Sequence, residues 1–260
     1  MKNRMNVTLS LAVVMVMCFG CKENAKKLEV AENTQKVKVE QEPEWKKLFN
    51  GVDFEGWKSI ATGETPNKGW KVIDGELVVN EAGGGESENG GDIITKKKFA
   101  DFELQWEWKM LTKGGNSGLK YYVNSTGENN EKYGLGIEYQ ILDDEFHPWM
   151  LEGKMKPGDY YTVGAAYNLY APGVDKKVMP RGEWNKSRII SKNGKVEHWL
   201  NGELTVKFDR FSKDFDERVA KSKFHKYEGF GKHESGHILL QDHGGNVHYR
   251  NIMIKEFPKQ

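Results

Sequence analysis

A short run in the middle of the chain has the residue types of a sugar-binding strand. Residues 138–144 read Glu-Tyr-Gln-Ile-Leu-Asp-Asp. Because successive side chains of a strand point to opposite faces, Glu138 and Gln140 lie on one face. Tyr139 and Ile141 lie on the other, where they can join a core. The carboxylate and the amide then stand about 7 Å apart, a spacing at which neighbouring groups can hold one sugar ring.

A second polar cluster lies near the end of the chain, where Gln241, Asp242 and His243 are followed by Arg250 and Asn251. Two glycines come directly after His243, so we expect its imidazole on a tight turn at the end of a strand, held rigidly at a sheet edge. If the fold brings the two clusters together, they form a carbohydrate site with a carboxylate and an imidazole for acid–base chemistry.

The elements that must position these residues are strands. No segment keeps a helical apolar period for long, whereas period-two patterns recur between turn signals such as Asp74-Gly75 and Asn193-Gly194. The predicted strands are 70–73, 76–79, 99–111, 118–123, 138–142, 187–191, 196–200, 203–208, 238–240 and 247–254. Many short strands with frequent turns predict an all-β antiparallel sandwich. The irregular stretches 83–92, 144–156 and 213–236 are expected to be rim loops, where sites are often built.

The N-terminus predicts export. Two basic residues precede an apolar run over residues 7–19, which matches a secretory signal peptide of residues 1–20 and is too short for a comfortable membrane span. One interpretation is an ordinary signal cut near Gly20. The interpretation that we prefer is a bacterial lipoprotein, in which Cys21 becomes the lipidated first residue.

The rest of the chain divides into a tether and a domain. Residues 21–44 are rich in Lys, Glu, Asn and Gln and have too few large apolar residues to bury a face. We therefore expect a flexible tether between a lipid anchor and a domain of residues 45–260, in a periplasmic or outer-membrane lipoprotein. The chain has 39 Lys and Arg against 38 Asp and Glu and no basic stripe, so nucleic acid is not an expected partner. Both cysteines, Cys18 and Cys21, precede the domain, which excludes a disulfide framework within it.

One motif suggests a metal and needs a separate interpretation. Residues 233–237, His-Glu-Ser-Gly-His, have the spacing of a zinc protease, which works only on a helix. Glycines surround the motif and a strand-like segment follows, so we interpret the match as accidental. A divalent metal held by His243, His147 or Asp143 is possible, but no ligand spacing requires one. No cofactor is firmly expected.

Several motifs occur in a recognisable order along the domain. They are Leu-Phe-Asn-Gly at 48–51, Gly-Trp at 56–57, Gly-Asn-Ser-Gly at 115–118, the strand at 138–143, Gly-Glu-Trp-Asn at 182–185, His-Trp-Leu-Asn-Gly at 198–202, Gly-His-Ile-Leu-Leu-Gln-Asp-His at 236–243 and Arg-Asn-Ile at 250–252. In these motifs the chain closely resembles the bacterial 3-keto-disaccharide hydrolase family, also described as 3-keto-glucoside 1,2-lyase/3-keto-2-hydroxy-glucal hydratase domains. The resemblance covers about residues 45–257. It implies a concanavalin-like jelly-roll sandwich of two curved antiparallel sheets, with a site on the concave face.

The resemblance also implies a reaction on a small oligosaccharide or glycoside that a separate dehydrogenase has already oxidised at C3. A base removes the hydrogen on C2, the enolate expels the group on C1, and water adds to the resulting 2-hydroxy-glucal. Such a site needs a base near C2, a cationic or hydrogen-bonding group at the enolate oxygen, and an acid at the leaving oxygen.

The two clusters contain residues for each of these roles. The candidates for proton transfer are Glu138, Asp143, Asp242 and His243. The cationic candidates for the enolate oxygen are Lys120 and Arg250, with a divalent metal as the alternative. The candidates for sugar contacts are Asn116, Gln140, Gln241 and Trp199. Lys120 departs from the arginine that is more usual in the family, and a lysine is a poorer bidentate partner for a diol. Arg250 has an alternative interpretation as part of an internal hydrogen-bond network, and Asn116 as a turn cap.

Two other functions remain open at this point. A retaining glycosidase needs two carboxyl groups about 5–5.5 Å apart. In the strand of residues 138–143, Gln140 stands where a second acid of such an enzyme would be. Asp143 points away from Glu138 unless a bulge realigns it. A non-catalytic carbohydrate-binding module would need the amides and aromatic rings but no acid–base pair.

Overall fold

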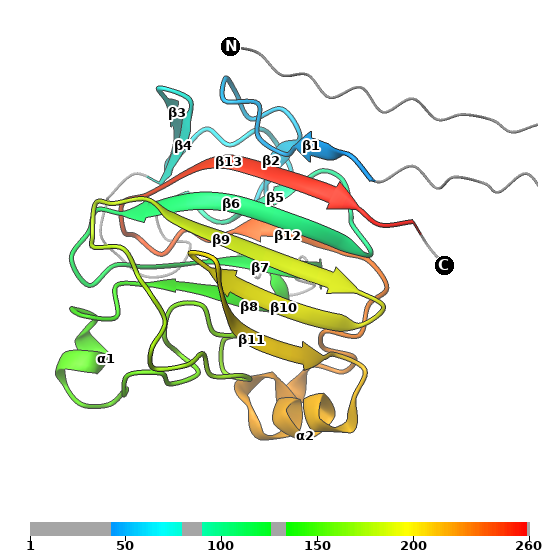
Figure 1. Cartoon of the computed structure of the whole chain (residues 1–260). Coiled ribbons are helices and arrows are strands. Elements are labelled where there is room, and N and C mark those ends of the chain that lie inside the picture. The colour runs from blue at the N-terminus through cyan, green and yellow to red at the C-terminus, as the bar shows by residue number, and fades with distance from the viewer. Residues whose placement is uncertain (1–42, 80–89, 126–133, 259–260) are drawn as a thin grey trace, which may run out of the picture. The chain divides into compact units, whose positions relative to one another are not determined.

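The computed structural model describes residues 43–79, 90–125 and 134–258, which form two antiparallel sheets (Figure 1). The predicted signal peptide, Cys21 and nearly all of the predicted tether lie outside the described residues, as does most of the stretch 83–92. Within the described part of the chain, no helix is long and apolar enough to cross a membrane. The all-β jelly-roll sandwich expected from the strand pattern and the resemblance is confirmed.

The larger sheet has eight strands in the order β11-β10-β9-β6-β13-β4-β3, with β1 paired to β13. Its strands are β1 (Trp45–Lys47), β3 (Trp70–Ile73), β4 (Glu76–Val79), β6 (Phe102–Met110), β9 (Asn185–Lys192), β10 (Lys195–Leu200), β11 (Glu203–Asp209) and β13 (Val247–Glu256). The predicted hairpins at Asp74-Gly75 and Asn193-Gly194 are both present. Asp74 and Asn193 adopt positive φ, as tight two-residue turns require.

The smaller sheet has five strands in the order β2-β5-β12-β7-β8, and Figure 1 shows it behind the larger one. Its strands are β2 (Trp57–Ser59), β5 (Ile93–Thr95), β7 (Asn116–Ser125), β8 (Leu135–Leu142) and β12 (His237–Leu240). Strand β7 pairs with β8 on one side and with the central strand β12 on the other. The strand of Glu138 and Gln140 and the segment of Gln241–His243 that follows β12 thus belong to the same sheet, whereas Arg250 and Asn251 of the second cluster lie on β13 of the larger sheet.

Aromatic rings fill the space between the sheets. Trp106 of β6 packs edge to face on Tyr139 of β8, with ring centroids 5.0 Å apart. His198 of β10 lies 2.9 Å from the hydroxyl of Tyr121 of β7 through its Nε2 atom. All four side chains are almost completely buried. Because Tyr139 points into this core, its neighbours along β8 must point out of it.

Helical segments connect some strands where the sequence predicted loops. They are α1 (Pro148–Leu151), α2 (Lys213–Lys221) and a 3₁₀ helix at Lys223–Lys226. The expectation that residues 213–236 form a loop throughout is wrong. Helix α2 buries Phe215 as its single core residue, so its sequence shows no sustained apolar period. It begins at the N-cap Ser212, whose hydroxyl accepts a hydrogen bond from the backbone N–H of Phe215 at 3.2 Å.

Candidate active site

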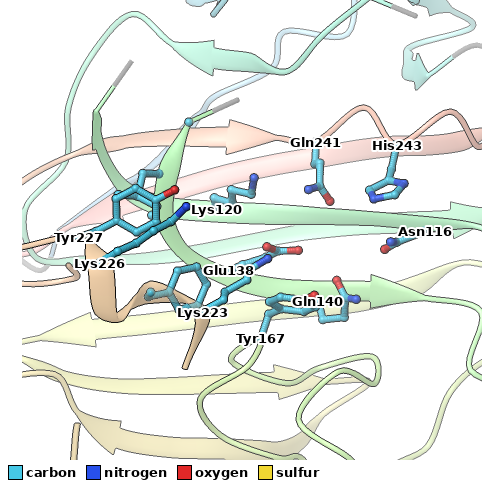
Figure 2. A pocket seen from close by; sticks show the side chains of 14 residues that line it. Asn116, Lys120, Glu138, Gln140, Tyr167, Lys223, Lys226, Tyr227, Gln241 and His243 are labelled. Atoms are coloured by element: carbon cyan, nitrogen blue, oxygen red, sulfur yellow. The ribbon is translucent and has the colours of Figure 1, made fainter. Parts of the chain in front are cut away.

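A pocket of about 290 Å³ lies on the face of the five-stranded sheet that points away from the core (Figure 2). Asn116 and Lys120 of β7 line it, with Glu138 and Gln140 of β8 beside them. The register of the two strands pairs Lys120 with Glu138. The predicted alternation along residues 138–142 is therefore what aims a carboxylate and an amide into one cavity.

Gly118 lets a carboxylate and an amide converge over the middle of β7. Its backbone oxygen accepts a hydrogen bond from the N–H of Gln241 at 3.0 Å, which brings the end of β12 beside β7. A Cβ atom added at Gly118 would lie 2.7 Å from Oε1 of Glu138 and 3.2 Å from Oε1 of Gln241. The two side chains thus occupy the space that any larger residue at position 118 would take.

One wall of the pocket follows the outer edge of β8. The backbone N–H of Gly164 donates to the oxygen of Gln140 at 2.9 Å, and that of Tyr167 donates to the oxygen of Glu138 at 3.0 Å. These bonds satisfy the edge strand, which would otherwise leave backbone groups unpaired. They also place the ring of Tyr167 against the pocket, close to Glu138 and Gln140 (Figure 2).

The 3₁₀ helix supplies cations to one end of the pocket. Lys223 and Lys226 line it together with Tyr227. The backbone N–H of Lys223 donates to Oδ1 of Asn168 at 2.9 Å, and its Nζ lies 4.3 Å from the ring centroid of Tyr167. A cation over an aromatic face is favourable, so the lysine and the tyrosine hold each other in place.

His243 reaches the pocket from a turn that Asp242 organises. The carboxylate of Asp242 accepts hydrogen bonds from the backbone N–H groups of Gly90, Gly91 and Gly244, at 2.8, 3.1 and 3.1 Å. Asp242 is fully buried, whereas His243 is only half-buried and lines the pocket. The tight turn expected for His243 is present, and the aspartate is what stabilises it.

Buried carboxylates lie beneath the floor of the pocket. Nζ of Lys120 is 3.8 Å from Oδ2 of Asp92, and both side chains are nearly inaccessible. Burial raises the pKa of Tyr249, and the charges of Asp92, Asp242 and Glu138 raise it further. Lys120 therefore lies directly beside a buried carboxylate at the floor of the pocket.

Two amide oxygens in the pocket have no protein partner among the described residues. They are Oδ1 of Asn116 and Oε1 of Gln140, and both atoms are buried. Gln140 donates through Nε2 to the backbone oxygen of Tyr161 at 3.2 Å, which leaves its oxygen facing the cavity. Buried acceptors are normally satisfied in folded proteins. Hydroxyl groups of a bound sugar would supply the missing donors.

A second compartment of about 270 Å³ continues from the first. The residues that line both compartments are Asn116, Gln140, Tyr167 and His243. The second compartment adds His147, Trp149 and Tyr161. Burial lowers the pKa of His147, and the neighbouring His243 lowers it further. One imidazole is thus kept neutral beside the other.

Two residues predicted for this site, Trp199 as a sugar contact and Arg250 as a cation, lie elsewhere. Trp199 and Arg250 belong to strands of the eight-stranded sheet and are absent from the lining of both compartments. Arg250 donates through Nε to Glu107 at 2.6 Å, as the alternative interpretation of an internal network expected. Trp199 lies under the guanidinium of Arg188, at 4.5 Å from the ring centroid. Their assignment to this site is corrected. Both residues lie on strands of the eight-stranded sheet, whereas the pocket lies on the five-stranded sheet.

Two of the predicted acid–base residues hold loops instead of lining the pocket. Asp143 accepts from the backbone N–H of Gly114 at 2.8 Å and caps the turn after β8. Asp242 is fully buried beneath the floor, and its carboxylate is occupied by backbone donors. Neither carboxylate can reach a ligand in the pocket, which leaves Glu138 as the carboxylate of its described lining.

Strand alternation gave no sign of the residues that reach the pocket from outside the sheet. These are Tyr167, Lys223, Lys226 and Tyr227, and Trp149 in the second compartment. His147, which the sequence suggested only as a possible metal ligand, also lines the second compartment. None belongs to a strand, so period-two alternation gives no sign of where they point. Ser212 and Ser222 cap the helical segments and are the sequence signal that could have revealed those elements.

The zinc-protease spacing at residues 233–237 does not correspond to a helix, as expected, because His237 is the first residue of β12. The Nδ1 atom of His237 lies 2.7 Å from the backbone oxygen of Thr95, which ties this side chain to β5. The described residues contain no group of three or more His, Cys, Asp or Glu side chains that could hold a metal ion.

The sandwich and its polar pocket define a protein of the jelly-roll class with a candidate ligand site on the five-stranded sheet. The sequence matches the 3-keto-alpha-glucoside-1,2-lyase-like domain over residues 44–255. The chain belongs to this family, which confirms the resemblance.

Relatives of known sequence and structure agree with this assignment. The chain is 33% identical to a 3-keto-disaccharide hydrolase of Bacteroides thetaiotaomicron over 229 residues, which cover 80% of this chain and 77% of that protein. A crystal structure of a candidate glycosyl hydrolase from Parabacteroides distasonis superimposes with a TM-score of 0.72 at 36% identity, over 82% of this chain and 94% of that one. A second such structure from the same organism has a TM-score of 0.62 at 27% identity, over 82% and 100% of the two chains.

Proposed function

We propose that the protein cleaves the glycosidic bond of 3-keto-glycosides by elimination followed by hydration, with net hydrolysis. The observation that carries the proposal is the convergence of a carboxylate, a lysine and an imidazole around one cavity floored by amide oxygens. These are the base, the cation and the acid that the reaction needs. Family membership and the name of the Bacteroides relative support the same reaction class.

Glu138 is the base in this proposal. Its carboxylate takes the hydrogen on C2 as a proton, and the C–H electron pair forms an enolate across C2 and C3, with negative charge on the C3 oxygen. Lys120 faces Glu138 across the strand pair and is the nearest cation on the floor. Its ammonium group stabilises the enolate oxygen as charge develops there.

His243 is the acid at the leaving group. The enolate re-forms the C3 carbonyl and a C1=C2 double bond while the C1–O bond breaks, and the imidazolium donates a proton to the departing oxygen. Water then adds to C1 as His243 takes its proton, and Glu138, whose own proton exchanges with solvent while the leaving group departs, delivers a proton to C2. Both side chains end in their starting states, and no electron is gained or lost overall.

The ketone must be present before the sugar binds. The reaction class that supplies the substrate is therefore a dehydrogenation at C3 of a glycoside or small oligosaccharide by a separate enzyme. The ketone is essential because it acidifies the C2 hydrogen. An unoxidised glycoside in the same pocket would have no acidic hydrogen for Glu138 to remove.

The rival functions have less support from the geometry. A retaining glycosidase needs two carboxyl groups about 5–5.5 Å apart astride the sugar. Among the described residues, the pocket lining contains Glu138 but no second carboxylate, because Asp143 is held at the turn after β8. A non-catalytic module would bind sugars without turnover, so an activity assay separates it from an enzyme.

The test is turnover of a 3-keto-glucoside beside its unoxidised parent in D₂O, with products identified by mass spectrometry. We expect cleavage of the keto form alone and one deuterium at C2 of the product, because hydration delivers a solvent-derived proton there. A reaction without enzyme corrects for spontaneous exchange. Cleavage of both sugars without deuterium would establish a glycosidase, and binding of both without turnover would establish a binding module.

We also propose that the protein is an exported lipoprotein anchored through Cys21, on the basis of the N-terminal sequence alone. Metabolic labelling with a palmitate analogue would test this. Label on the wild type and none on Cys21→Ala is the expected result, and equal label on both would contradict it.

A further inference from the structure

A buried aspartate beside the pocket has no role in the reaction described above. Asp92 directly precedes β5, is completely inaccessible to solvent and does not line the pocket. Its Oδ2 atom lies 3.8 Å from Nζ of Lys120, whose side chain is 8% exposed. Taking a carboxylate out of water costs stability unless opposite charge or hydrogen bonds compensate it. Asp92 is compensated through groups that belong to the candidate active site.

The first of these groups is the ammonium of Lys120. Strands β5 and β7 are the two neighbours of β12, so Asp92 and Lys120 approach each other from either side of that strand. A lysine has a flexible four-carbon stem, and an ammonium without an anchor would sample many positions. The attraction of a buried carboxylate restricts the ammonium to the floor of the pocket, where the enolate charge develops in the proposed reaction.

The second group is the peptide that joins Gln241 to Asp242. Its N–H donates to Oδ1 of Asp92 at 3.0 Å, and its oxygen accepts from the hydroxyl of Ser117 at 2.7 Å. Asp92 and Ser117 are both buried, so the plane of this peptide is fixed at each end. The peptide directs the side chain of Gln241 into the pocket and begins the turn that carries His243 (Figure 2).

Stability alone does not explain a charged pair at this place. Replacing a buried ion pair by apolar residues of similar volume is often neutral or stabilising. A lysine that is needed for chemistry has to stay charged and in one position, and the buried carboxylate of Asp92 meets both requirements.

We propose that Asp92 is a positioning residue for catalysis, which sets Lys120 and the turn of His243 relative to each other through one buried carboxylate. This assignment rests on the function proposed above. Lys120 stabilises the enolate and His243 protonates the leaving oxygen, whereas Asp92 touches neither the sugar nor a reacting atom. The groups that serve the two steps of the reaction are thus aligned from beneath the pocket.

Asp92→Asn tests the hold on Lys120. The amide keeps an oxygen for the N–H of Asp242 but loses the charge that attracts the ammonium. The kcat for a 3-keto-glucoside should fall about 10²-fold, because a catalytic group is misplaced. KM should stay within about threefold of the wild type, because the lining is intact. Asp92→Ser removes the same charge and should give the same loss, so the test does not depend on the folding of one variant.

Deuterium exchange at C2 of the recovered substrate in D₂O shows which step is affected. In Asp92→Asn exchange should fall in proportion to cleavage, because enolate formation is slowed. Ser117→Ala frees the other end of the peptide without changing a charge. His243 should then protonate the leaving oxygen less efficiently, so the recovered substrate should gain more deuterium per cleavage event than with the wild type. An unchanged ratio in Ser117→Ala would contradict the hold on the turn.

Asp101→Asn is the matched control. Asp101 also accepts a backbone N–H of a turn, that of Asn193 at 2.9 Å, and lines neither compartment. Its kinetics should match those of the wild type. Reduced thermal stability of Asp92→Asn with unchanged kcat and unchanged exchange would leave Asp92 a structural role only and overturn the inference.

A further measurement separates this inference from the proposed function. If the wild type turns over no 3-keto-glycoside, the proposed function fails. The hold on Lys120 is then judged by covalent modification with an amine reagent, mapped by mass spectrometry. Faster modification of Lys120 in Asp92→Asn than in the wild type supports it, and an unchanged rate overturns it.

Discussion

The outer faces of the two sheets are built from the same strand alternation and have opposite character. On the eight-stranded sheet, acidic and basic side chains pair with one another across neighbouring strands. On the five-stranded sheet, polar side chains are more deeply buried, and two amide oxygens have no partner among the described residues. Polar residues that are mutually satisfied stabilise a surface, whereas buried unsatisfied ones await a ligand.

The pairing on the eight-stranded sheet is regular. Glu107 contacts Arg250 at 2.6 Å, and Glu103 contacts Lys255 at 2.8 Å. Burial alone would raise the pKa of Glu76, but its hydrogen bonds with His248 and Lys109 lower it overall. Each of these three carboxylates thus has a partner of opposite charge or a hydrogen-bond donor at a short distance.

On the five-stranded sheet Glu138 is 7% exposed and Gln140 is 2% exposed. A buried acceptor without a donor, such as Oε1 of Gln140 among the described residues, costs stability unless a ligand supplies the hydrogen bond. The buried acceptors of the five-stranded sheet are therefore suited to binding a ligand, whereas the paired charges of the eight-stranded sheet are suited to contact with water.

The largest effect is expected at the carboxylate of the pocket. Glu138→Gln keeps the shape of the side chain but removes its basicity, so kcat for a 3-keto-glycoside should fall by about 10³-fold. The melting temperature should change little, because the neutral amide fills the same volume. Steady-state kinetics and thermal unfolding measure the two effects.

The matched change on the other face is Glu107→Gln. It removes a half-buried carboxylate from a face that has no assigned chemistry, and kcat should stay within about twofold of the wild type. A comparable loss in both variants would mean that the contrast between the two faces does not reflect function.

The contrast also shows what could be predicted from the sequence. Period-two alternation aims Glu138 and Gln140 together, and the run after Gln241 predicts the turn that carries His243. These patterns are local, so they can be read along the chain. Ten of the thirteen strands among the described residues could be predicted for the same reason, including both hairpins, whereas the three-residue strands β1, β2 and β5 were not predicted.

The rest depends on contacts that alternation does not encode. A strand pattern shows that one side is polar but not to which sheet the strand belongs, so Trp199 and Arg250 were assigned to the wrong face. Tyr167 and Lys223 reach the pocket from loop and 3₁₀ segments through backbone bonds to β8 and Asn168. Such positions depend on contacts between residues that are far apart in the sequence.

The next effect concerns the space above β7. In Gly118→Ala the new methyl carbon would lie 2.7 Å from Oε1 of Glu138, so the carboxylate must move. A displacement of this size should lower kcat/KM about 10²-fold. The backbone at Gly118 has no positive φ, so alanine can adopt it and the fold should persist.

Gly173→Ala is the control for the glycine change. No atom lies within 4 Å of the position that a methyl group would take at Gly173, and its φ is also ordinary. The kinetics of this variant should match those of the wild type. If Gly118→Ala retained full activity, Glu138 would not need the position that the structure assigns to it.

The core between the two sheets is a third environment, and its His198, on β10 of the eight-stranded sheet, should affect stability and not catalysis. Burial lowers the pKa of His198 to about 3, so the ring is neutral in the folded state. The unfolded chain binds a proton near pH 6.5 and the folded chain does not, so stability falls as the pH is lowered. This group alone should cost about 2 kcal/mol between pH 8 and pH 5.

Urea unfolding of the wild type and His198→Gln at several pH values measures this contribution. The variant should be less stable at pH 8 but lose less stability on acidification. NMR titration of the wild-type imidazole provides a check that does not depend on the variant. A His198 resonance that titrates near the ordinary pKa of 6.5 would contradict the buried neutral ring.

The smallest effect is expected at Arg250, on the face shaped for water. Arg250→Ala removes the 2.6 Å contact with Glu107, but Glu107 retains Lys186 at 3.8 Å. Since the guanidinium side chain is 38% exposed, solvent screens the pair and the loss should be below about 1 kcal/mol. A double-mutant cycle with Glu107→Gln measures the coupling free energy.

Turnover of the 3-keto-glycoside should be unchanged, because Arg250 contacts Glu107 and the ring of Trp184 and lines neither compartment. A tenfold loss of turnover with little loss of stability would show that the outer face of the eight-stranded sheet takes part in substrate binding, and the contrast between the two faces would then fail.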